Sequence, residues 1–143
     1  MIRKLIRNSL IGLLLCCLSA CALNDLMNSP AEQRQESLDT FVQAMRLGEF
    51  KVAASYLTQN NRAAFLNQFE ALEKDLTFVE TRVEEVTILD EGDKVDVVLE
   101  LDYFLLPSAT VKTFRFDHTW AYVEPGGNQV SGYLIETPFP SFP

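Results

Sequence analysis

The amino-acid sequence predicts an α+β domain in which helices come first and a curved antiparallel sheet follows. From residue 30 to about residue 74, apolar residues recur every three or four positions, a spacing typical of helices that pack on one side. From residue 76 to residue 137, apolar and polar residues alternate, as they do in strands that bury one face. Because the helices precede consecutive hairpins, we expect one curved sheet that wraps around the helices.

The first helix is expected to begin within Ser29-Pro30-Ala31-Glu32. The serine is a good N-cap, proline is favoured at the first helical position, and the glutamate can complete a capping box. Gly48 is placed to end this helix, because glycine readily adopts the left-handed conformation that often follows a helix.

Two shorter helices are expected next. Residues 49–57 form the second helix, and the third runs from a cap at Thr58 or Asn60 to about Lys74. The third helix carries an apolar stripe that we interpret as core rather than as ligand contacts. The stripe consists of Phe65, Leu66, Phe69 and Leu72.

Four strands are expected in the second half of the chain. The alternation slips in phase near Glu84 and Glu85, which predicts a β-bulge in the first strand. Turn residues at 90–93, at Pro107-Ser108 and at 125–128 separate the strands. The four strands cover residues 76–88, 95–105, 110–124 and 129–137.

This order of elements, with residues 44–57 early and Thr119-Trp120-Ala121-Tyr122 late, resembles the NTF2-like (SnoaL-like) superfamily. The resemblance covers residues 31–137 and depends on layout and hydrophobic pattern. It implies that one long helix and two shorter ones fill the open end of a cone-shaped sheet. Ketosteroid isomerases, polyketide cyclases and dehydratases of this superfamily place acid, base and tyrosine residues around the cavity, and none of those sets aligns with this sequence.

The first 20 residues have the layout of a secretory signal peptide. The basic residues Arg3, Lys4 and Arg7 precede an apolar run over residues 10–18 and the small pair Ser19-Ala20. A spanning helix needs about 20 apolar residues, and this run is much shorter. We therefore expect the segment to be removed rather than to cross a membrane permanently.

The end of this segment, Leu18-Ser19-Ala20-Cys21, resembles the lipobox of bacterial lipoproteins. The resemblance implies that the chain is cleaved before Cys21 and that acyl chains on Cys21 anchor it to a membrane. Ala22, in place of aspartate, implies the periplasmic side of the outer membrane if the source is Gram-negative. The alternative is an ordinary signal peptide that contains a cysteine by chance. The expected organisation is a signal peptide over residues 1–20, a lipidated cysteine and tether over residues 21–29, and a domain over residues 30–143.

Composition narrows the range of partners. The 20 acidic and 12 basic residues give a formal net charge of -8, and loss of the three basic residues of the signal leaves 20 against 9, or -11. Such a charge repels phosphate groups, so nucleic acid is not an expected partner and lipid must hold the protein at the membrane. Cys16, Cys17 and Cys21 are the only cysteines, so no disulfide is expected within the mature domain.

One side of the predicted third strand is almost entirely aromatic. Such a row either lines a cavity for a small apolar ligand or packs against the helices as ordinary core, and the second interpretation is the more usual. The row consists of Phe114, Phe116, His118, Trp120 and Tyr122, and the other side carries Arg115, Asp117, Thr119 and Ala121.

His118 is the only histidine in the chain. A single histidine without clustered acids gives little support for a metal site, and no cofactor is expected. Inside a cavity, His118 could act as a general base if Asp102 or Tyr103 on the neighbouring strand oriented it or the substrate. A hydrogen-bonded core histidine is the more ordinary interpretation.

The sequence favours binding over catalysis. It shows no nucleophilic cysteine, phosphate-binding glycine loop or serine–histidine–acid arrangement. The leading hypothesis is a membrane-anchored, non-enzymatic module that binds an envelope protein or a small apolar ligand, with a homodimer through the open sheet face as an option. The alternative is an NTF2-like isomerase, dehydratase or cyclase that uses His118 with Asp102 or Tyr103.

Two further surfaces have open interpretations. The acidic first hairpin is either a solvated face or a docking surface for a basic partner. The proline-rich residues 138–143 cannot continue a strand ladder, because proline lacks the backbone donor. Phe139 and Phe142 therefore either lie across the sheet or are displayed to a partner.

Overall fold

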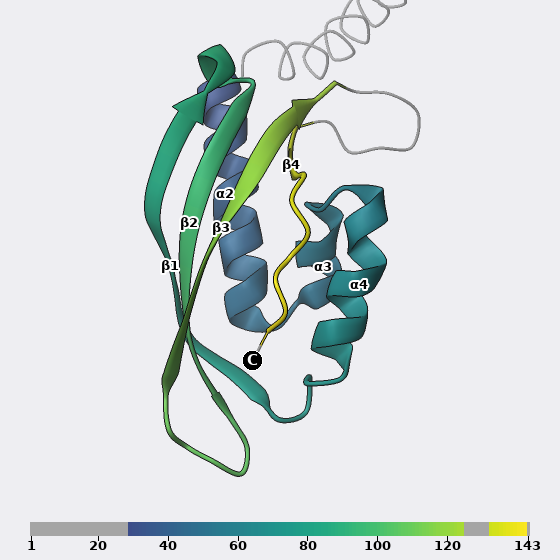
Figure 1. Ribbon diagram of the computed structural model, residues 1–143, viewed down its shortest axis with the longest axis vertical. Helices are drawn as coiled ribbons and strands as arrows, with labels where there is room; N and C mark the ends of the chain where they lie inside the picture. The colour runs from purple at the N-terminus through teal and green to yellow at the C-terminus, as the bar shows by residue number, and fades with distance from the viewer. Residues whose placement is uncertain (1–28, 125–131, 143) are drawn as a thin grey trace, which may run out of the picture. The chain divides into compact units, whose positions relative to one another are not determined.

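The computed structural model describes residues 29–124 and 132–142 (Figure 1). The chain divides into the units Met1–Glu32 and Gln33–Pro143. The first unit is described only over residues 29–32, which include the start of the helix Pro30–Leu47. The predicted signal peptide, lipobox and tether, up to residue 28, lie outside the described residues, as do the predicted hairpin at 125–128 and residues 129–131 of the last strand.

The three predicted helices are present as α2 (Pro30–Leu47), α3 (Phe50–Ser55) and α4 (Gln59–Glu70). The capping box is confirmed, because the Glu32 amide donates to Ser29 Oγ at 3.3 Å and the Ser29 amide donates to Glu32 Oε2 at 2.8 Å. Gly48 ends α2 at φ +71°, and the amides of Gly48 and Glu49 donate to the last-turn carbonyls of Met45 and Ala44. This is a Schellman motif.

Helix α4 begins after Thr58, one of the two predicted caps, and ends at Glu70 rather than near Lys74. The amide of Leu72 donates to the carbonyl of Phe69, so the chain leaves the helix through tighter turns. The apolar stripe is core at Phe65 and Phe69, which are 1% and 0% exposed.

The strands form one antiparallel sheet in chain order, β1-β2-β3-β4. Register shifts interrupt β1 between Val83 and Glu85, where a bulge is predicted, and also between Phe78 and Glu80. The helices lie on one side of the strands, so the predicted α+β class with helices against a curved antiparallel sheet is confirmed (Figure 1). The bounds are Leu76–Leu89 for β1, Lys94–Leu105 for β2, Lys112–Val123 for β3 and Gly132–Ile135 for β4, with a short 3₁₀ helix η1 at Asp90–Gly92.

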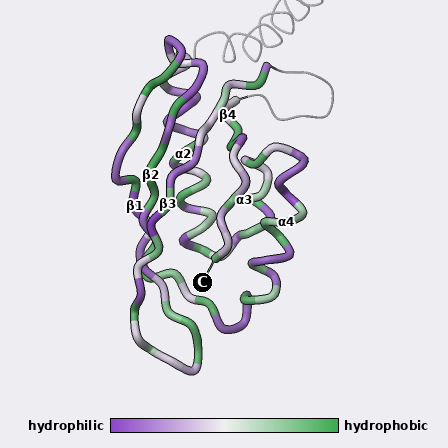
Figure 2. Tube along the Cα trace, viewed as in Figure 1, coloured by the Kyte–Doolittle hydropathy of each residue, from purple (hydrophilic) through white to green (hydrophobic). Residues whose placement is uncertain are grey.

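The core lies between the helices and the inner face of the sheet. Along β2, every second residue from Val95 to Tyr103 is buried, as the alternating hydropathy of this strand predicts (Figure 2). The edge strand β1 is less covered. Its residues Val83, Val86 and Ile88 are paired with buried residues of β2, yet they are 37%, 42% and 58% exposed.

Strand β4 connects the sheet to the helices. The Ile135 amide donates to the Tyr56 carbonyl at 2.7 Å, and the Thr58 amide donates to the Ile135 carbonyl at 3.0 Å. After β4 the chain runs between the sheet and α4 as an extended segment over residues 137–142, which we call the tail (Figure 1). Pro138 and Pro140 lack the N–H that strand pairing needs, so the ladder stops before them.

Candidate binding site

The aromatic row of β3 faces the helices. Phe116, His118 and Trp120 are 6%, 2% and 1% exposed, and Phe114 is half-buried. Tyr122, the last residue of the predicted row, continues the alternation but is 36% exposed. It pairs with Tyr133 of β4, and the centroids of the two rings are 5.5 Å apart. Its neighbour Ala121, expected on the open side, is buried.

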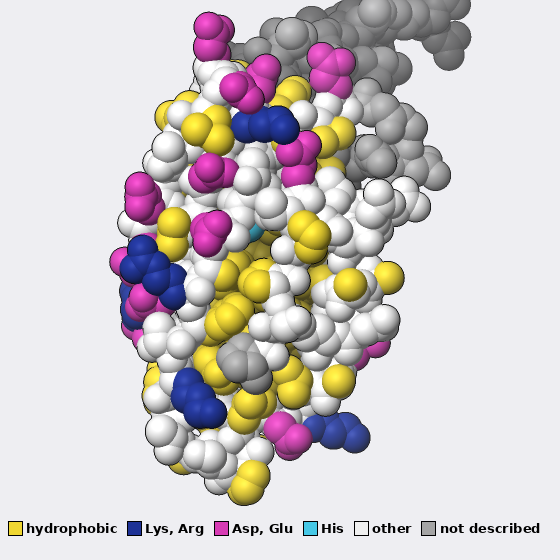
Figure 3. All heavy atoms as spheres, in the orientation of Figure 1, with side chains coloured by type: hydrophobic (Ala, Val, Ile, Leu, Met, Phe, Trp, Pro, Cys, Tyr) yellow, Lys and Arg dark blue, Asp and Glu magenta, His cyan; other side chains and the backbone are white. Residues whose placement is uncertain are grey.

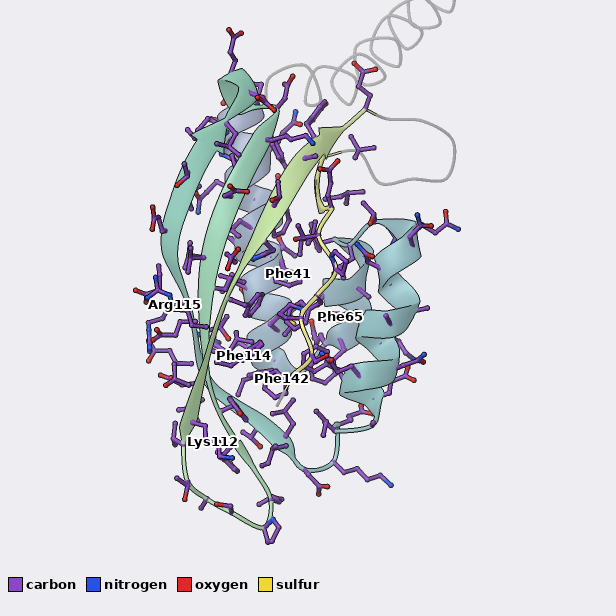
Figure 4. All side chains as sticks on the ribbon, in the orientation of Figure 1. Phe41, Phe65, Lys112, Phe114, Arg115 and Phe142 are labelled. Carbon is purple, nitrogen blue, oxygen red and sulfur yellow. The ribbon has the colours of Figure 1, made fainter. Side chains whose placement is uncertain are left out.

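Helices α2 and α4 supply the opposing aromatic side chains. The ring of Phe41 on α2 meets Trp120 edge-on at 5.5 Å and lies 6.0 Å from His118. Phe65 and Phe69 project from α4 on the other side of the tail. Figure 4 shows Phe41, Phe65 and Phe114 pointing toward the space between the sheet and the helices.

The tail fills part of this space with two phenylalanine rings. Phe139 lies 4.6 Å from Phe116 and 5.1 Å from Phe65, and Phe142 lies 5.1 Å from Phe114. Of the two options for these rings, the structure shows the first, since they lie across the sheet. We call the surface beneath them the tail-binding surface. It consists of Phe65, Gln68, Phe69, Phe78, Tyr103, Phe114 and Phe116.

Gln68 on α4 holds the backbone of the tail. Its Nε2 donates to the Pro140 carbonyl at 3.3 Å, and its Oε1 accepts from the Phe142 amide at 3.1 Å. Both polar ends of one side-chain amide are thus used on one segment, which fixes the position of that segment along α4.

His118 is a core residue whose ring nitrogens have no hydrogen-bond partner among the described residues. Burial lowers the pKa of His118 to about 4, and the Val97 backbone and the carboxylates of Asp117 and Asp96 offset this only partly. The imidazole is therefore neutral at pH 7. Hydrophobic side chains gather at the centre of the face shown in Figure 3.

The proposed acid–base partners of His118 are not beside it. His118 pairs with Val97 across the sheet, whereas Asp102 pairs with Thr113. Thr113 lies five positions from His118 along β3, which is about 17 Å at ~3.3 Å per residue. Tyr103 is buried against Phe142, one position further away, so the structure does not bring His118 together with either partner.

Asp102 belongs instead to an ion-pair cluster on the outer face of the sheet. Arg82 Nη1 donates to Glu80 at 2.7 Å and to Asp102 at 2.9 Å, and its Nη2 donates to Glu100. The carboxylates raise the pKa of Arg82 further above its ordinary value. The Thr113 hydroxyl donates to Asp102 at 2.6 Å, and this bond, followed by that of Arg82, lowers the pKa of the Asp102 carboxyl.

The replacement Thr113→Val is expected to raise the pKa of Asp102 toward its ordinary value, because it removes the largest cause of the lowering. Carbon-13 NMR titration of the Asp102 carboxyl measures it. Thr119→Val is the matched control, since the Thr119 hydroxyl donates to Asp96 and not to Asp102. An unchanged Asp102 titration in the Thr113 variant would contradict the assignment.

Two of the pockets formed by the described residues lie near the α2–α3 corner, and neither is lined by the aromatic row. One is bordered by Phe50, Leu66 and Glu73, the other by Gln43, Leu47 and Val52. Within residues 29–124 and 132–142, no three histidine, cysteine or acidic side chains are grouped so as to hold a metal ion. Over the same ranges, no helix has both the length and the apolar content needed to cross a bilayer.

Sequence reasoning missed Gln68 and the part played by Phe41. Phe41 lies on the apolar side of α2, but helical spacing does not say which strand residues it meets. Gln68 is a polar residue beside an apolar stripe, and nothing in the sequence marks it as a residue that contacts the tail. The spacing of Phe139 and Phe142 among prolines was the one available signal for the tail.

Comparison with known proteins bears on the fold. No protein-family model and no curated protein matches the chain. A SEC-C motif containing protein from Psychrobacter arcticus matches with TM-score 0.57 and 13% identity over 76% of this chain and 61% of that one, so this chain spans less than two thirds of its length.

Two further solved structures match over similar shares of the chain. An NTF2-like protein of unknown function from Shewanella oneidensis MR-1 has TM-score 0.50 and 15% identity over 75% of this chain and 94% of that one. A candidate polyketide cyclase from Xanthomonas campestris pv. campestris has TM-score 0.45 and 14% identity over 76% and 93%. With the helices packed against a curved four-stranded sheet, the match to the Shewanella structure shows that the chain has an NTF2-like α+β fold.

Proposed function

We propose that this chain is a lipid-anchored, non-enzymatic binding module of the bacterial envelope, and that its site is the aromatic inner face of β3. The observation that carries the proposal is the cluster of rings at the tail-binding surface, where Phe114 and Phe116 face Phe65 and Phe69 across the tail. Flat apolar walls with few polar groups suit an apolar segment of an envelope protein or a small apolar ligand.

The enzyme alternative lacks an assembled acid–base pair. A general base must lie within hydrogen-bonding reach of the proton it takes and of the group that orients it. His118 has no such partner among the described side chains, and the carboxylate of Asp102 is bound to Thr113 and Arg82 on the outer face. The geometry therefore supports binding better than isomerase, dehydratase or cyclase chemistry.

The anchor is proposed from the lipobox resemblance and the acidic charge of the domain. Cys21→Ser is expected to leave the precursor uncleaved and without acyl chains, because the thiol is the atom that lipid must join. Intact-mass measurement of the membrane fraction shows both whether the precursor is cleaved and whether it carries acyl chains. Cys17→Ser is the matched control and should be processed normally. A Cys21→Ser protein that still carries lipid would refute the anchor.

Loss of the aromatic site is expected to abolish partner recovery. The double variant Phe114→Ala/Phe116→Ala should reduce recovery of the bound protein or ligand from envelopes about tenfold or more, a range typical of buried aromatic contacts. Cross-linking of the anchored protein followed by mass spectrometry measures it. Arg115→Ala is the matched control, because Arg115 lies between the two phenylalanines but points away from the helices (Figure 4). Equal recovery in both variants would place the site elsewhere.

The proposal includes a homodimer through the open sheet face as an option. That face carries Arg82 with the acidic side chains of Glu80, Glu100 and Asp102. Two copies joined there would bring acidic clusters together, so such a dimer should be stabilised by salt. Light scattering of the purified mature chain at low and high salt would show it.

A further inference from the structure

The tail occupies its surface as a peptide ligand would. We propose that the tail-binding surface is a peptide-binding site, and that the partner it fits is an extended segment of another protein with two phenylalanines three residues apart. The inference rests on the proposed binding function and names the class of partner. It is carried by the hydrogen bonds of the tail, by the spacing of its rings, and by its short connection to β4.

The tail is not held as a strand. The sheet ends where the Glu136 amide donates to the Thr119 carbonyl at 2.9 Å and the Thr119 amide donates to the hydroxyl of Thr137 at 3.1 Å. Beyond this point, both described hydrogen bonds of the tail go to the Gln68 side chain. The side-chain amide bonds one backbone carbonyl and one backbone N–H. Any segment with an extended backbone can make these two bonds, so they suit the binding of a peptide.

The two phenylalanines of the tail are three residues apart, and each directly follows an exposed residue. Phe139 and Phe142 are half-buried, whereas Pro138 and Ser141 are exposed. A polyproline II segment has three residues per turn, so residues three apart lie on the same side. Proline-rich segments of this kind commonly bind surfaces lined with aromatic side chains.

The two rings of the tail share Phe69 as a neighbour and otherwise contact different residues. Phe139 packs between α4 and β3, 5.4 Å from Phe69 and 4.6 Å from Phe116. Phe142 packs on the sheet, 4.6 Å from Tyr103 and 5.1 Å from Phe114. The surface therefore has two aromatic subsites, and Gln68 forms hydrogen bonds with the backbone between the two rings.

The connection from β4 to the tail is short, so the tail competes strongly with any other segment. A ligand joined by a short linker has an effective concentration in the millimolar range. A partner segment must therefore displace the tail, and removal of the tail rings should reveal the site. This sets the expected direction of the experiment.

The test is a titration of the complete mature chain with a labelled peptide of the sequence of residues 136–143, followed by fluorescence anisotropy. Phe139→Ala/Phe142→Ala is expected to bind the peptide about tenfold or more tightly than the wild type does, because the competing rings are gone. A peptide with both phenylalanines replaced by alanine should not bind. Val52→Ala is the control, since Val52 is a 42% exposed residue of α3 that is not part of the tail-binding surface. It should bind the peptide as the wild type does.

A second variant keeps the inference falsifiable if the double variant does not fold. Gln68→Ala removes both of the hydrogen bonds made to residues 138–142 without changing the rings of the tail. Hydrogen exchange at the Phe142 amide is expected to become about tenfold faster or more, while exchange at the Phe116 amide stays unchanged. Equal acceleration at both amides would show that the tail opens only with the whole domain, and would overturn the inference.

Three other outcomes have separate meanings. If the double variant binds N-phenyl-1-naphthylamine but not the peptide, the peptide inference fails and the proposed apolar site stands. If it binds neither, both fail. If the wild type forms a dimer that disappears in the double variant, the occupant is the tail of a second copy, and the assignment to another protein is overturned.

Discussion

Replacement of Phe69 with alanine is expected to lower the free energy of unfolding by about 3–5 kcal/mol, the range measured for large buried aromatic residues. Phe69 is fully buried and is the ring on which the two tail subsites and α3 converge. Its removal leaves a cavity that cannot collapse easily, because its neighbours come from four different segments. These neighbours are Phe50, Phe65, Phe78, Phe139 and Phe142, with centroids 4.7–6.2 Å away.

Urea denaturation of the complete mature chain, followed by far-ultraviolet circular dichroism, measures this loss. Val52→Ala is the control, since Val52 is a 42% exposed residue of α3 and should change the free energy of unfolding by about 0.5 kcal/mol or less. A loss below about 1 kcal/mol for Phe69→Ala would mean that the rings around it repack, and that the aromatic cluster is less rigid than the contacts indicate.

The helices and strands could be predicted because their signals are local. The capping box of Ser29 and Glu32 and the left-handed Gly48 each involve residues close in sequence, and both occur as expected. The bulge near Glu84 was visible as a change of phase. The second shift, next to Phe78, has the same signal, because the apolar positions change there from Leu76 and Phe78 to Val79 and Val83, but it was not predicted.

The candidate site could be predicted only in part, because it depends on register and on what covers each face. Alternation along β3 places Phe114, Phe116, His118 and Trp120 on one side, but it does not say where the helices stop covering that side. Tyr122 is exposed for this reason. Alternation also does not fix the register between β2 and β3, so the distance from His118 to Asp102 could not be predicted.

Between pH 6.5 and pH 4, His118 is expected to reduce the free energy of unfolding by about 3 kcal/mol, at 1.36 kcal/mol per pKa unit. The pKa of His118 is lowered from 6.5 to about 4 because the folded chain excludes water from the ring. In this interval the unfolded chain binds the proton and the folded chain does not, so acid favours unfolding. Above pH 6.5 neither state binds the proton, so the free energy of unfolding keeps its full value. It declines as the pH falls, and the loss is complete at about pH 4, where the folded chain begins to bind the proton as well.

The control is the same pH series on His118→Phe, which keeps an aromatic ring beside Phe41 and Trp120 but cannot bind a proton. Any packing cost of the variant is independent of pH. The informative quantity is therefore the difference in free energy of unfolding between the wild type and the variant, and how this difference changes with pH. That difference should change by about 3 kcal/mol in favour of the variant from pH 7 to pH 4. The lowered pKa of Asp102 acts mainly below 3.8 and is common to both chains, so it does not contribute to the difference. Parallel curves over the whole range would show that water reaches the imidazole in the folded chain, and that His118 lines an open cavity rather than a closed core.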